Sequence, residues 1–512
     1  MAKFSRIRVR PRSAIKTAGM PAARTHEGAR AFLRDPKSEL FLLAVTNMVA
    51  ERTFYEGATE RDARFVELIH RVTNEDPEWM QRFVPWLRNE ANMRSAAAVA
   101  AAEYVKAGGS QGRKVIASAV ARADEPAEIL AYWAQEHGRA YPQPVKRGVA
   151  DAARRQYTQN TALKYDGRSR AWRMGDVIEL THPKPVDAEQ SDLFRYLLDR
   201  RHHPETLTVP ESLAKVGLRI DLDKTPGEQR RELLRERGAE LLKEAGATWE
   251  WLSGWVPGGM DAEAWETVIP SMGYMALLRN LRNFDEAGIS GERVRYVQGV
   301  LSDPERVARS RQFPYRFWSA YKNVPSLHWA STLETALEHS VANIPALPGR
   351  TLVLTDTSAS MTWPMAGQTK IRHFEIAALF AAATAKRAAA VDMVSFASGW
   401  EPIRFRKTQS ILRTIEKVES RIGVVGHGTM LGHAVRATYR GHDRVVVFSD
   451  MQTHDQVPAL PGATVYVFNT GGYRATPLAV GTKGHYELGG FSDATFRLMA
   501  LLENLQDAGW PF

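Results

Sequence analysis

Five oxygen-bearing side chains stand where they could bind one divalent cation together. Three follow the apolar run 351–355, one precedes a helical stretch, and one follows the apolar run 444–449. Both runs predict buried parallel strands, and open α/β sheets bind ligands at the carboxyl ends of such strands. Carboxylate and hydroxyl oxygens suit a hard cation such as Mg²⁺. The predicted metal ligands are Asp356, Ser358, Ser360, Thr429 and Asp450.

The segment Asp356-Thr357-Ser358-Ala359-Ser360 also has simpler interpretations. Aspartate and serine are common in turns that cap helices. A dehalogenase-like phosphatase begins with an aspartate at a strand end, but it needs a second aspartate two residues later, where this chain has a serine. The two later ligands each lie beside a predicted helix or strand, and they favour the metal site.

The elements that must position these residues follow a Pro/Gly-rich link at 345–349. Strands and helices alternate after it, which predicts βαβ units and a mostly parallel sheet. The predicted strands are 351–355, 391–396, 444–449 and 464–468, and the predicted helices lie around 371–390, 409–421, 430–440 and 492–507.

The chain before residue 345 shows almost no period-2 pattern and predicts serial amphipathic helices instead. These helices are 61–72, 78–88, 94–106, 111–122, 144–157, 191–201 and 229–245. Repeated helices of this length predict a HEAT-like α-solenoid, although no clean sequence period accompanies them.

Positive charge is concentrated in two segments of this chain, whose formal net charge is +10. Residues 1–24 contain seven Lys or Arg and no acid, and residues 139–184 contain ten basic and four acidic residues. The rest is therefore close to neutral, so both segments favour a polyanion-binding surface. Residues 1–30 are predicted to form a basic arm, of which residues 1–24 are expected to be flexible.

Composition excludes several classes of protein. The 512 residues include no cysteine, so disulfides, thiolate zinc sites and cysteine nucleophiles are excluded, and a reducing cytoplasm is expected. No uncharged apolar stretch reaches the about 18 residues of a membrane span, so no membrane partner is expected.

The basic part of the 144–157 helix lies on one face. At about 100° per residue, Lys146, Arg147, Arg154 and Arg155 lie opposite an apolar arc that begins with Val145. Such a row of cations is commonly a solvated face. The sequence that follows favours nucleic-acid binding instead.

Residues 163–173 interleave four cations with two aromatic residues, and residues 180–185 form a turn with a histidine and a lysine. Arginine forks suit phosphates, while aromatic faces stack on unpaired bases. The candidate RNA-binding residues here are Lys164, Arg168, Arg170, Trp172, His182 and Lys184.

These segments resemble the TROVE module of the Ro autoantigen family. The resemblance rests on Leu163-Lys164-Tyr165, Arg168, Trp172, Thr181-His182-Pro183-Lys184-Pro185, Met275 to Leu281, Pro314 to Phe317, and Thr53 to Gly57. The five predicted metal ligands resemble the metal-ion-dependent adhesion site of von Willebrand factor A domains. In the Ro family a TROVE module precedes such a domain, which is the order found here.

The predicted architecture is multidomain. After the basic arm at 1–30, the resemblance implies an all-α HEAT-like TROVE ring at 31–345 and an α/β von Willebrand A domain at 349–512. It implies that a small structured Y RNA binds the basic outer surface and that single-stranded 3′ ends of misfolded RNA enter a central hole. Lys164, Arg168, Arg170 and His182 then fall on the RNA-contacting surface. The Y RNA could tether an exoribonuclease such as polynucleotide phosphorylase.

We therefore expect a non-catalytic, cytoplasmic RNA-binding protein that acts in RNA quality control and holds Mg²⁺ or a similar cation. Two alternatives stay open. One is a protein-binding helical scaffold whose metal accepts a partner's carboxylate. The other is a metal-dependent enzyme that cleaves RNA.

Overall fold

Two compact units make up the chain in its computed structural model. Unit 1 comprises Met1–Val72, Gln312–Ser319 and Leu337–Phe512, and unit 2 comprises Thr73–Arg311 and Ala320–Ala336. The structure describes residues 10–46, 49–167, 169–324, 326–342, 344–365, 370–460, 462–481, 484–490, 496–504 and 506–512.

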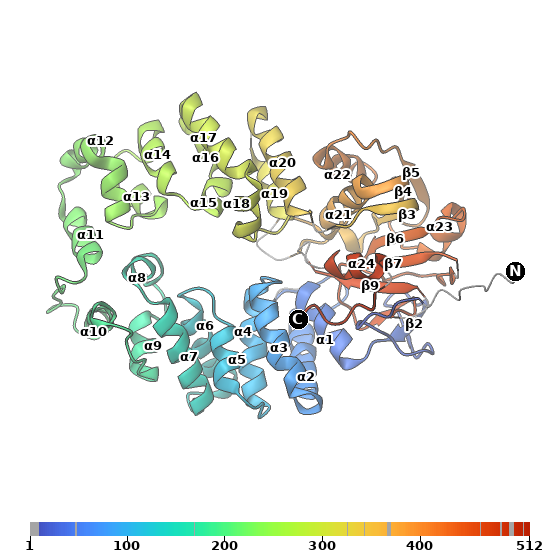
Figure 1. Ribbon diagram of the computed structural model, residues 1–512, viewed down its shortest axis with the longest axis horizontal. Helices are drawn as coiled ribbons and strands as arrows, with labels where there is room; N and C mark the ends of the chain where they lie inside the picture. The colour runs from blue at the N-terminus through green and yellow to red at the C-terminus, as the bar shows by residue number, and fades with distance from the viewer. Residues whose placement is uncertain are drawn as a thin grey trace, which may run out of the picture. The chain divides into compact units, whose positions relative to one another are not determined.

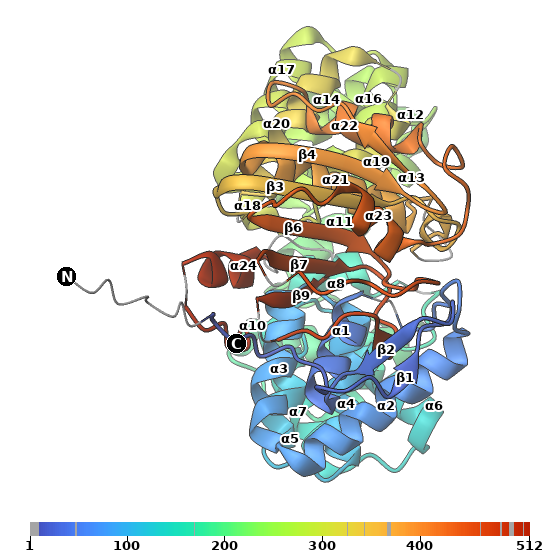
Figure 2. The same ribbon diagram turned by 90° about the vertical axis from the view of Figure 1, so that its right-hand side faces the viewer.

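Unit 1 is built around a six-stranded sheet with the strand order β5-β4-β3-β6-β7-β9 (Figures 1 and 2). All neighbouring strands are parallel except β4 and β5. The strands are β3 (Leu347–Asp356), β4 (Ala388–Phe396), β5 (Trp400–Ile403), β6 (Arg444–Ser449), β7 (Thr464–Asn469) and β9 (His485–Gly489). Because β4 and β6 flank β3 on opposite sides, the strand order reverses at β3, where open α/β sheets place their ligands.

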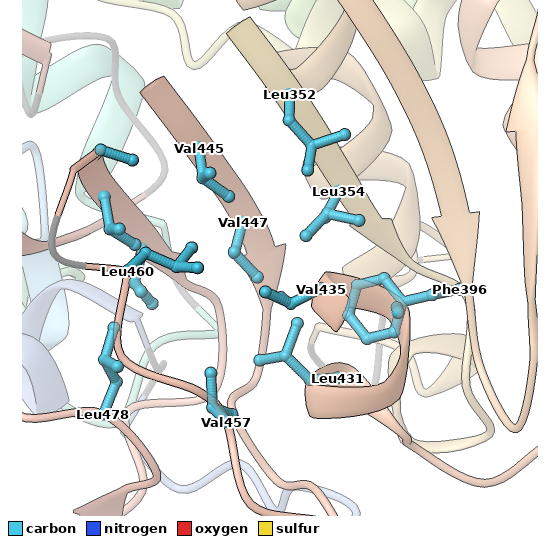
Figure 3. Packing of buried hydrophobic residues seen from close by; sticks show 14 of the residues in the cluster. Leu352, Leu354, Phe396, Leu431, Val435, Val445, Val447, Val457, Leu460 and Leu478 are labelled. Carbon is cyan, nitrogen blue, oxygen red and sulfur yellow. The ribbon is translucent and has the colours of Figure 1, made fainter. Parts of the chain in front are cut away.

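Helices cover both faces of this sheet. Leu352, Leu354 and Val447 pack against Leu431 and Val435 of helix α23 in one buried apolar cluster (Figure 3). On the other face, Phe380 of α21 meets Phe468 of β7. The helices of this half are α21 (His373–Arg387), α22 (Ile411–Glu419), α23 (Leu431–Thr438) and α24 (Phe496–Glu503), with the short η3 (Ser360–Thr362) after β3.

The N-terminal segment belongs to unit 1. Strands β1 (Ala23–Arg24), β2 (Arg30–Leu33) and β8 (Ala475–Thr476) form a small antiparallel sheet. Helices α1 (Pro36–Thr46) and α2 (Ala58–Glu75) follow. The prediction of a flexible arm at 1–24 is wrong for residues 10–24, because Ile15 is buried and the backbone of Ser13 and Thr17 bonds to Gly481 and Val480.

Unit 2 is helical. It contains α3 (Pro77–Asn89), α4 (Arg94–Lys106), α5 (Gly112–Ser118), α6 (Glu125–His137), α7 (Gln143–Gln156), α8 (Gln159–Tyr165), α9 (Met174–Thr181), α10 (Ala188–His202), α11 (Ala214–Lys224), α12 (Gly227–Glu244), α13 (Trp249–Trp255), α14 (Ala262–Val268), η1 (Ile269–Ser271), α15 (Tyr274–Arg279), α16 (Leu281–Ala287), α17 (Gly291–Ser302), α18 (Pro304–Ser310) and η2 (Leu327–Trp329). Helices α19 (Tyr315–Asn323) and α20 (Ala330–Ser340) contribute residues to both units.

The predicted order of a helical region before an α/β region is confirmed, but the predicted domain boundaries differ from the division into units. Residues 31–72 lie with the α/β sheet in unit 1, whereas the sequence assigned them to the helical module. Arg34 explains part of this: it is buried and forms an ion pair with Glu487 of β9. In the described part of the chain, no helix has both the length and the apolar character needed to cross a membrane.

Candidate functional site

The five predicted metal ligands lie at neighbouring ends of unit 1 elements. Asp356 ends β3, Asp450 directly follows β6, and Thr429 lies two positions before Leu431, the first residue of α23. The backbone N–H of Ala359, between Ser358 and Ser360, donates to the carbonyl of His427 at 2.9 Å. All five side chains are buried.

Hydrogen bonds join these side chains into one network. The Asp356 carboxylate accepts from the backbone N–H of Ser358 at 2.9 Å and from the Ser449 hydroxyl at 2.5 Å. The Ser358 and Ser360 hydroxyls are 3.3 Å apart, and the Ser360 hydroxyl lies near enough to the Asp450 carboxylate to lower its pKa. The two carboxylates and the serine hydroxyls therefore converge on one small volume.

The electrostatics of this pair fit a bound cation. Burial raises the pKa of Asp356 to about 6, and burial together with the Asp356 charge raises the pKa of Asp450 to about 7. Among the described residues, no positively charged side chain contributes to either shift. A divalent cation would supply the missing positive charge, and the oxygen donors suit Mg²⁺.

The candidate ligand set contains hydroxyl groups as well as carboxylates. No cluster of three or more His, Asp or Glu side chains suited to a metal occurs among the described residues. The candidate therefore consists of two carboxylates and three hydroxyls. His427 is exposed, as expected of a residue that does not bind the metal.

Residues that the sequence did not assign to this site also reach it. The Tyr55 phenol donates to the Glu27 carboxylate and lies near enough to Ser360 for that hydroxyl to lower its pKa. Burial and then the charge of Asp450 raise the pKa of Tyr55, so its hydroxyl stays a neutral donor. The only sequence signal was the segment 53–57, which carried part of the family resemblance.

The predicted cationic face of α7 lies in unit 2. Val145 and Val149 are buried, while Arg147, Arg154 and Arg155 are exposed and Lys146 is half-buried. Arg155 has a structural role, because its guanidinium donates to the carbonyls of Ala117 and Val120 at 2.8 Å each. Neither Arg147 nor Arg154 pairs with an acid among the described residues.

A second group of cations surrounds Tyr165 at the end of α8. The Lys164 ammonium lies 5.3 Å from the Tyr165 ring centroid and the Arg122 guanidinium lies 5.2 Å from it. Arg122 was missing from the predicted site because it lies in a separate segment before α6. Asp124 joins the group, since its carboxylate binds Arg122 at 2.9 Å and Arg170 at 3.6 Å.

The remaining candidates lie on loops beside these helices, and Arg168 falls outside the described residues. Trp172 is half-buried, and His182 and Lys184 are exposed. His182 ends α9 with a φ of 48°, a left-handed conformation that turns the chain out of the helix. These residues are accessible, but whether they bind RNA stays a prediction.

The chain matches known proteins in two ways. Residues 243–366 match the TROVE domain family. The crystal structure of the Ro (Rsr) protein of Deinococcus radiodurans matches with a TM-score of 0.59 and 18% identity, covering 90% of this chain and 99% of that chain. The chain has a TROVE domain and the fold of a Ro protein. The predicted fold class, a helical region followed by an α/β region, is thereby confirmed.

The TROVE match extends from the end of α12 to residue 366, so it includes Asp356, Ser358 and Ser360. It does not include the candidate RNA-binding residues at 146–184. A curated relative, telomerase protein component 1 of Mus musculus, is 38% identical over 71 residues, which are 14% of this chain and 3% of that protein. The chain therefore spans a small fraction of that relative.

Proposed function

We propose that this protein is a non-catalytic RNA-binding protein that acts in the cytoplasm in RNA quality control. A small structured Y-like RNA binds the basic surface of unit 2, and single-stranded ends of misfolded RNA bind the same helical module. An exoribonuclease such as polynucleotide phosphorylase is a partner through the Y-like RNA. The TROVE match and the Ro-like fold support this function.

The observation that carries the proposal is the combination of exposed cations and an aromatic ring on neighbouring helices. Arg147 and Arg154 present charge without an acidic partner among the described residues, and Lys164 and Arg122 lie over Tyr165. Guanidinium groups bind phosphates, and an aromatic face stacks on an unpaired base. Together these groups fit an RNA that has both a duplex and an unpaired segment.

Replacement of Lys164, Arg168 and Arg170 together by alanine tests this surface. Each lost phosphate contact lowers the slope of log affinity against log salt by about 0.7 to 0.9, so the triple variant should lose roughly two to three units of slope. Binding of a structured RNA is measured by filter retention or fluorescence anisotropy at several salt concentrations. His182→Ala should weaken binding with little change of slope, because a neutral imidazole contributes stacking or a hydrogen bond.

The matched control removes three exposed cations elsewhere in unit 2, namely Arg282, Arg306 and Arg309. This control loses the same charge and should keep most of the wild-type slope. Equal losses in both triple variants would mean that binding depends on net charge alone. An unchanged slope in the first variant, with the fold intact, would exclude this surface.

We propose in addition that Asp356, Ser358, Ser360, Thr429 and Asp450 hold Mg²⁺ or a similar cation in unit 1. The cation would act as an electrophile toward an acidic group. This property supports the second candidate function, a scaffold that binds an acidic partner protein. Stable RNA length during incubation with Mg²⁺ supports the non-catalytic function, whereas shortening of the RNA would establish an RNA-cleaving enzyme.

A further inference from the structure

The chain brings a carboxylate of its own to the candidate metal centre. Residues 25–29, here called the cap turn, bind the segment that follows Asp450. The Thr25 hydroxyl donates to the Thr453 carbonyl at 2.7 Å, and the backbone N–H of His26 donates to the Gln452 side chain at 2.7 Å. Two independent hydrogen bonds thus fix the turn beside the site.

The turn itself is well formed. The N–H of Thr25 donates to the carbonyl of Ala29 at 2.9 Å, and the N–H of Gly28 donates to the carbonyl of Thr25 at 3.0 Å. Gly28 has a φ of 100°, which side-chain-bearing residues rarely adopt. This conformation directs the chain back toward β2 and leaves Glu27 at the tip.

Two side chains orient the carboxylate of Glu27. His454 contacts it at 2.8 Å through Nε2 and contacts the Glu27 carbonyl at 3.1 Å through Nδ1. The Tyr55 hydroxyl donates to the other carboxylate oxygen. His454 is tied to the site, because its backbone N–H donates to the carbonyl of Thr429 at 2.9 Å.

Tyr55 links Glu27 to the predicted ligands. Its hydroxyl lies near Ser360 and Asp450, because both groups influence the pKa of Tyr55. Its ring stacks on His26 at 5.0 Å between centroids and meets Tyr473 edge-on at 5.4 Å. The phenol is therefore held in place, and its hydroxyl donates to the Glu27 carboxylate on the side of the candidate metal centre.

We propose that Glu27 is an internal acidic ligand of the metal centre, occupying the place that a partner's carboxylate would take. The five proposed ligands provide only two carboxylates, and an adhesion-type cation accepts one further acidic group. The cap turn delivers that group from the same chain, so an acidic partner must displace the turn. This inference rests on the proposed metal centre.

The test measures binding of Mn²⁺ to the full chain by calorimetry and by electron paramagnetic resonance. Glu27→Gln keeps the size and hydrogen-bonding groups of the side chain but removes its charge, and it should weaken Mn²⁺ binding roughly 10- to 100-fold. Glu60→Gln removes an exposed carboxylate from α2 of the same unit and should leave the affinity unchanged. Affinity of Glu27→Gln within twofold of wild type would overturn the proposal.

Acetate provides a second test. Glu27→Ala leaves room for the carboxymethyl group that the substitution removes, so acetate should restore most of its Mn²⁺ affinity. The wild-type Mn²⁺ spectrum should not respond to acetate, because Glu27 already fills the position; a response in the wild-type protein would overturn the proposal without any variant. If the wild-type chain binds no Mn²⁺, the proposal of a metal centre is wrong. Equal Mn²⁺ binding by the wild type and Glu27→Gln would contradict only the role of Glu27.

Discussion

Arg154 and Arg155 are sequence neighbours on α7, but only Arg155 is used to build the fold. Its guanidinium donates to two carbonyls at the end of α5, whereas Arg154 is exposed and has no acidic partner among the described residues. The helical period correctly placed both on the polar face. It could not distinguish them, because the two acceptor carbonyls come from a separate helix.

This difference gives a prediction about stability and RNA binding. Arg155→Ala should lower the free energy of unfolding by about 1 kcal/mol, because two carbonyls lose their donor. Arg154→Ala should leave stability unchanged but weaken RNA binding. Urea unfolding and RNA titration of the two variants measure both effects, and equal loss of stability in both variants would contradict the assignment.

The two buried carboxylates of the metal centre predict a dependence on pH. Their pKa values, about 6 for Asp356 and about 7 for Asp450, lie above the ordinary value of 3.8. A carboxyl group with a raised pKa stabilises the folded state at low pH, and this contribution is lost as the pH rises through the folded pKa. The metal-free protein should therefore lose stability between about pH 4 and pH 7 through these groups.

Magnesium should reverse this loss. We expect Mg²⁺ to raise the thermal midpoint, relative to EDTA, more at pH 7.5 than at pH 5, because protons compete for the same oxygens. Scanning calorimetry in Mg²⁺ and in EDTA at both pH values provides the measurement. Asp450→Asn is the control, and its midpoint should not respond to Mg²⁺ at either pH. An equal response of the wild-type protein at both pH values would contradict the prediction.

At the scale of elements, most strands of the sheet could be predicted from the sequence. The packing of the N-terminal segment in the same unit could not. Apolar runs located β3, β4, β6 and β7, because buried parallel strands have few polar residues. Strand β5 escaped prediction because Pro402 interrupts a short edge strand. Strand β9 escaped it because buried charge, including Glu487, breaks the apolar pattern.

The basic, proline-containing composition of residues 1–30 predicted a solvated arm, because composition describes only the local chain and not its partners elsewhere in the sequence. Composition does not reveal that Arg34 and Glu487 neutralise each other, since 453 residues separate them. Glu27 and Tyr55 were also missing from the predicted metal site, because they too are far along the chain from its residues. Local patterns thus predicted the ligands at the strand ends, and only tertiary structure revealed the groups that cover them.

The buried ion pair predicts a large effect of one substitution. Arg34 contacts both oxygens of Glu487, at 2.6 and 2.7 Å, and its guanidinium also donates to the Tyr473 carbonyl. Arg34→Met should cost about 3 to 5 kcal/mol, because Glu487 is left buried without its cation. Arg30→Met, at an exposed position of β2, should change stability by less than about 0.5 kcal/mol. Urea unfolding measures both, and a small effect at Arg34 would contradict the role of the pair.

At the scale of the whole molecule, the two proposed binding sites lie in different units. The metal ligands belong to unit 1 and the cationic residues of α7 and α8 belong to unit 2. The sequence predicted this separation from the change of pattern near residue 345. It could not predict that residues 10–72 and 312–319 join unit 1, because those segments are helical or irregular in pattern.

This division predicts that loss of the metal leaves RNA binding intact. Asp356→Ala should abolish Mn²⁺ binding and leave the affinity for a structured RNA within about twofold, because the candidate RNA-binding residues belong to the other unit. Calorimetry and RNA titration on the same preparation measure both. A folded variant that loses RNA affinity would show that the two units are coupled.

The pairing of early and late residues also determines when unit 1 can form during synthesis. Pro11 accepts a hydrogen bond from the Tyr486 hydroxyl at 2.7 Å, across 475 positions of the chain. Domains generally fold as they leave the ribosome, N-terminal parts first, but this one must wait for residues near 487. Unit 2 can fold in the meantime, so Pro11 and its neighbours leave the ribosome long before the residues that they contact.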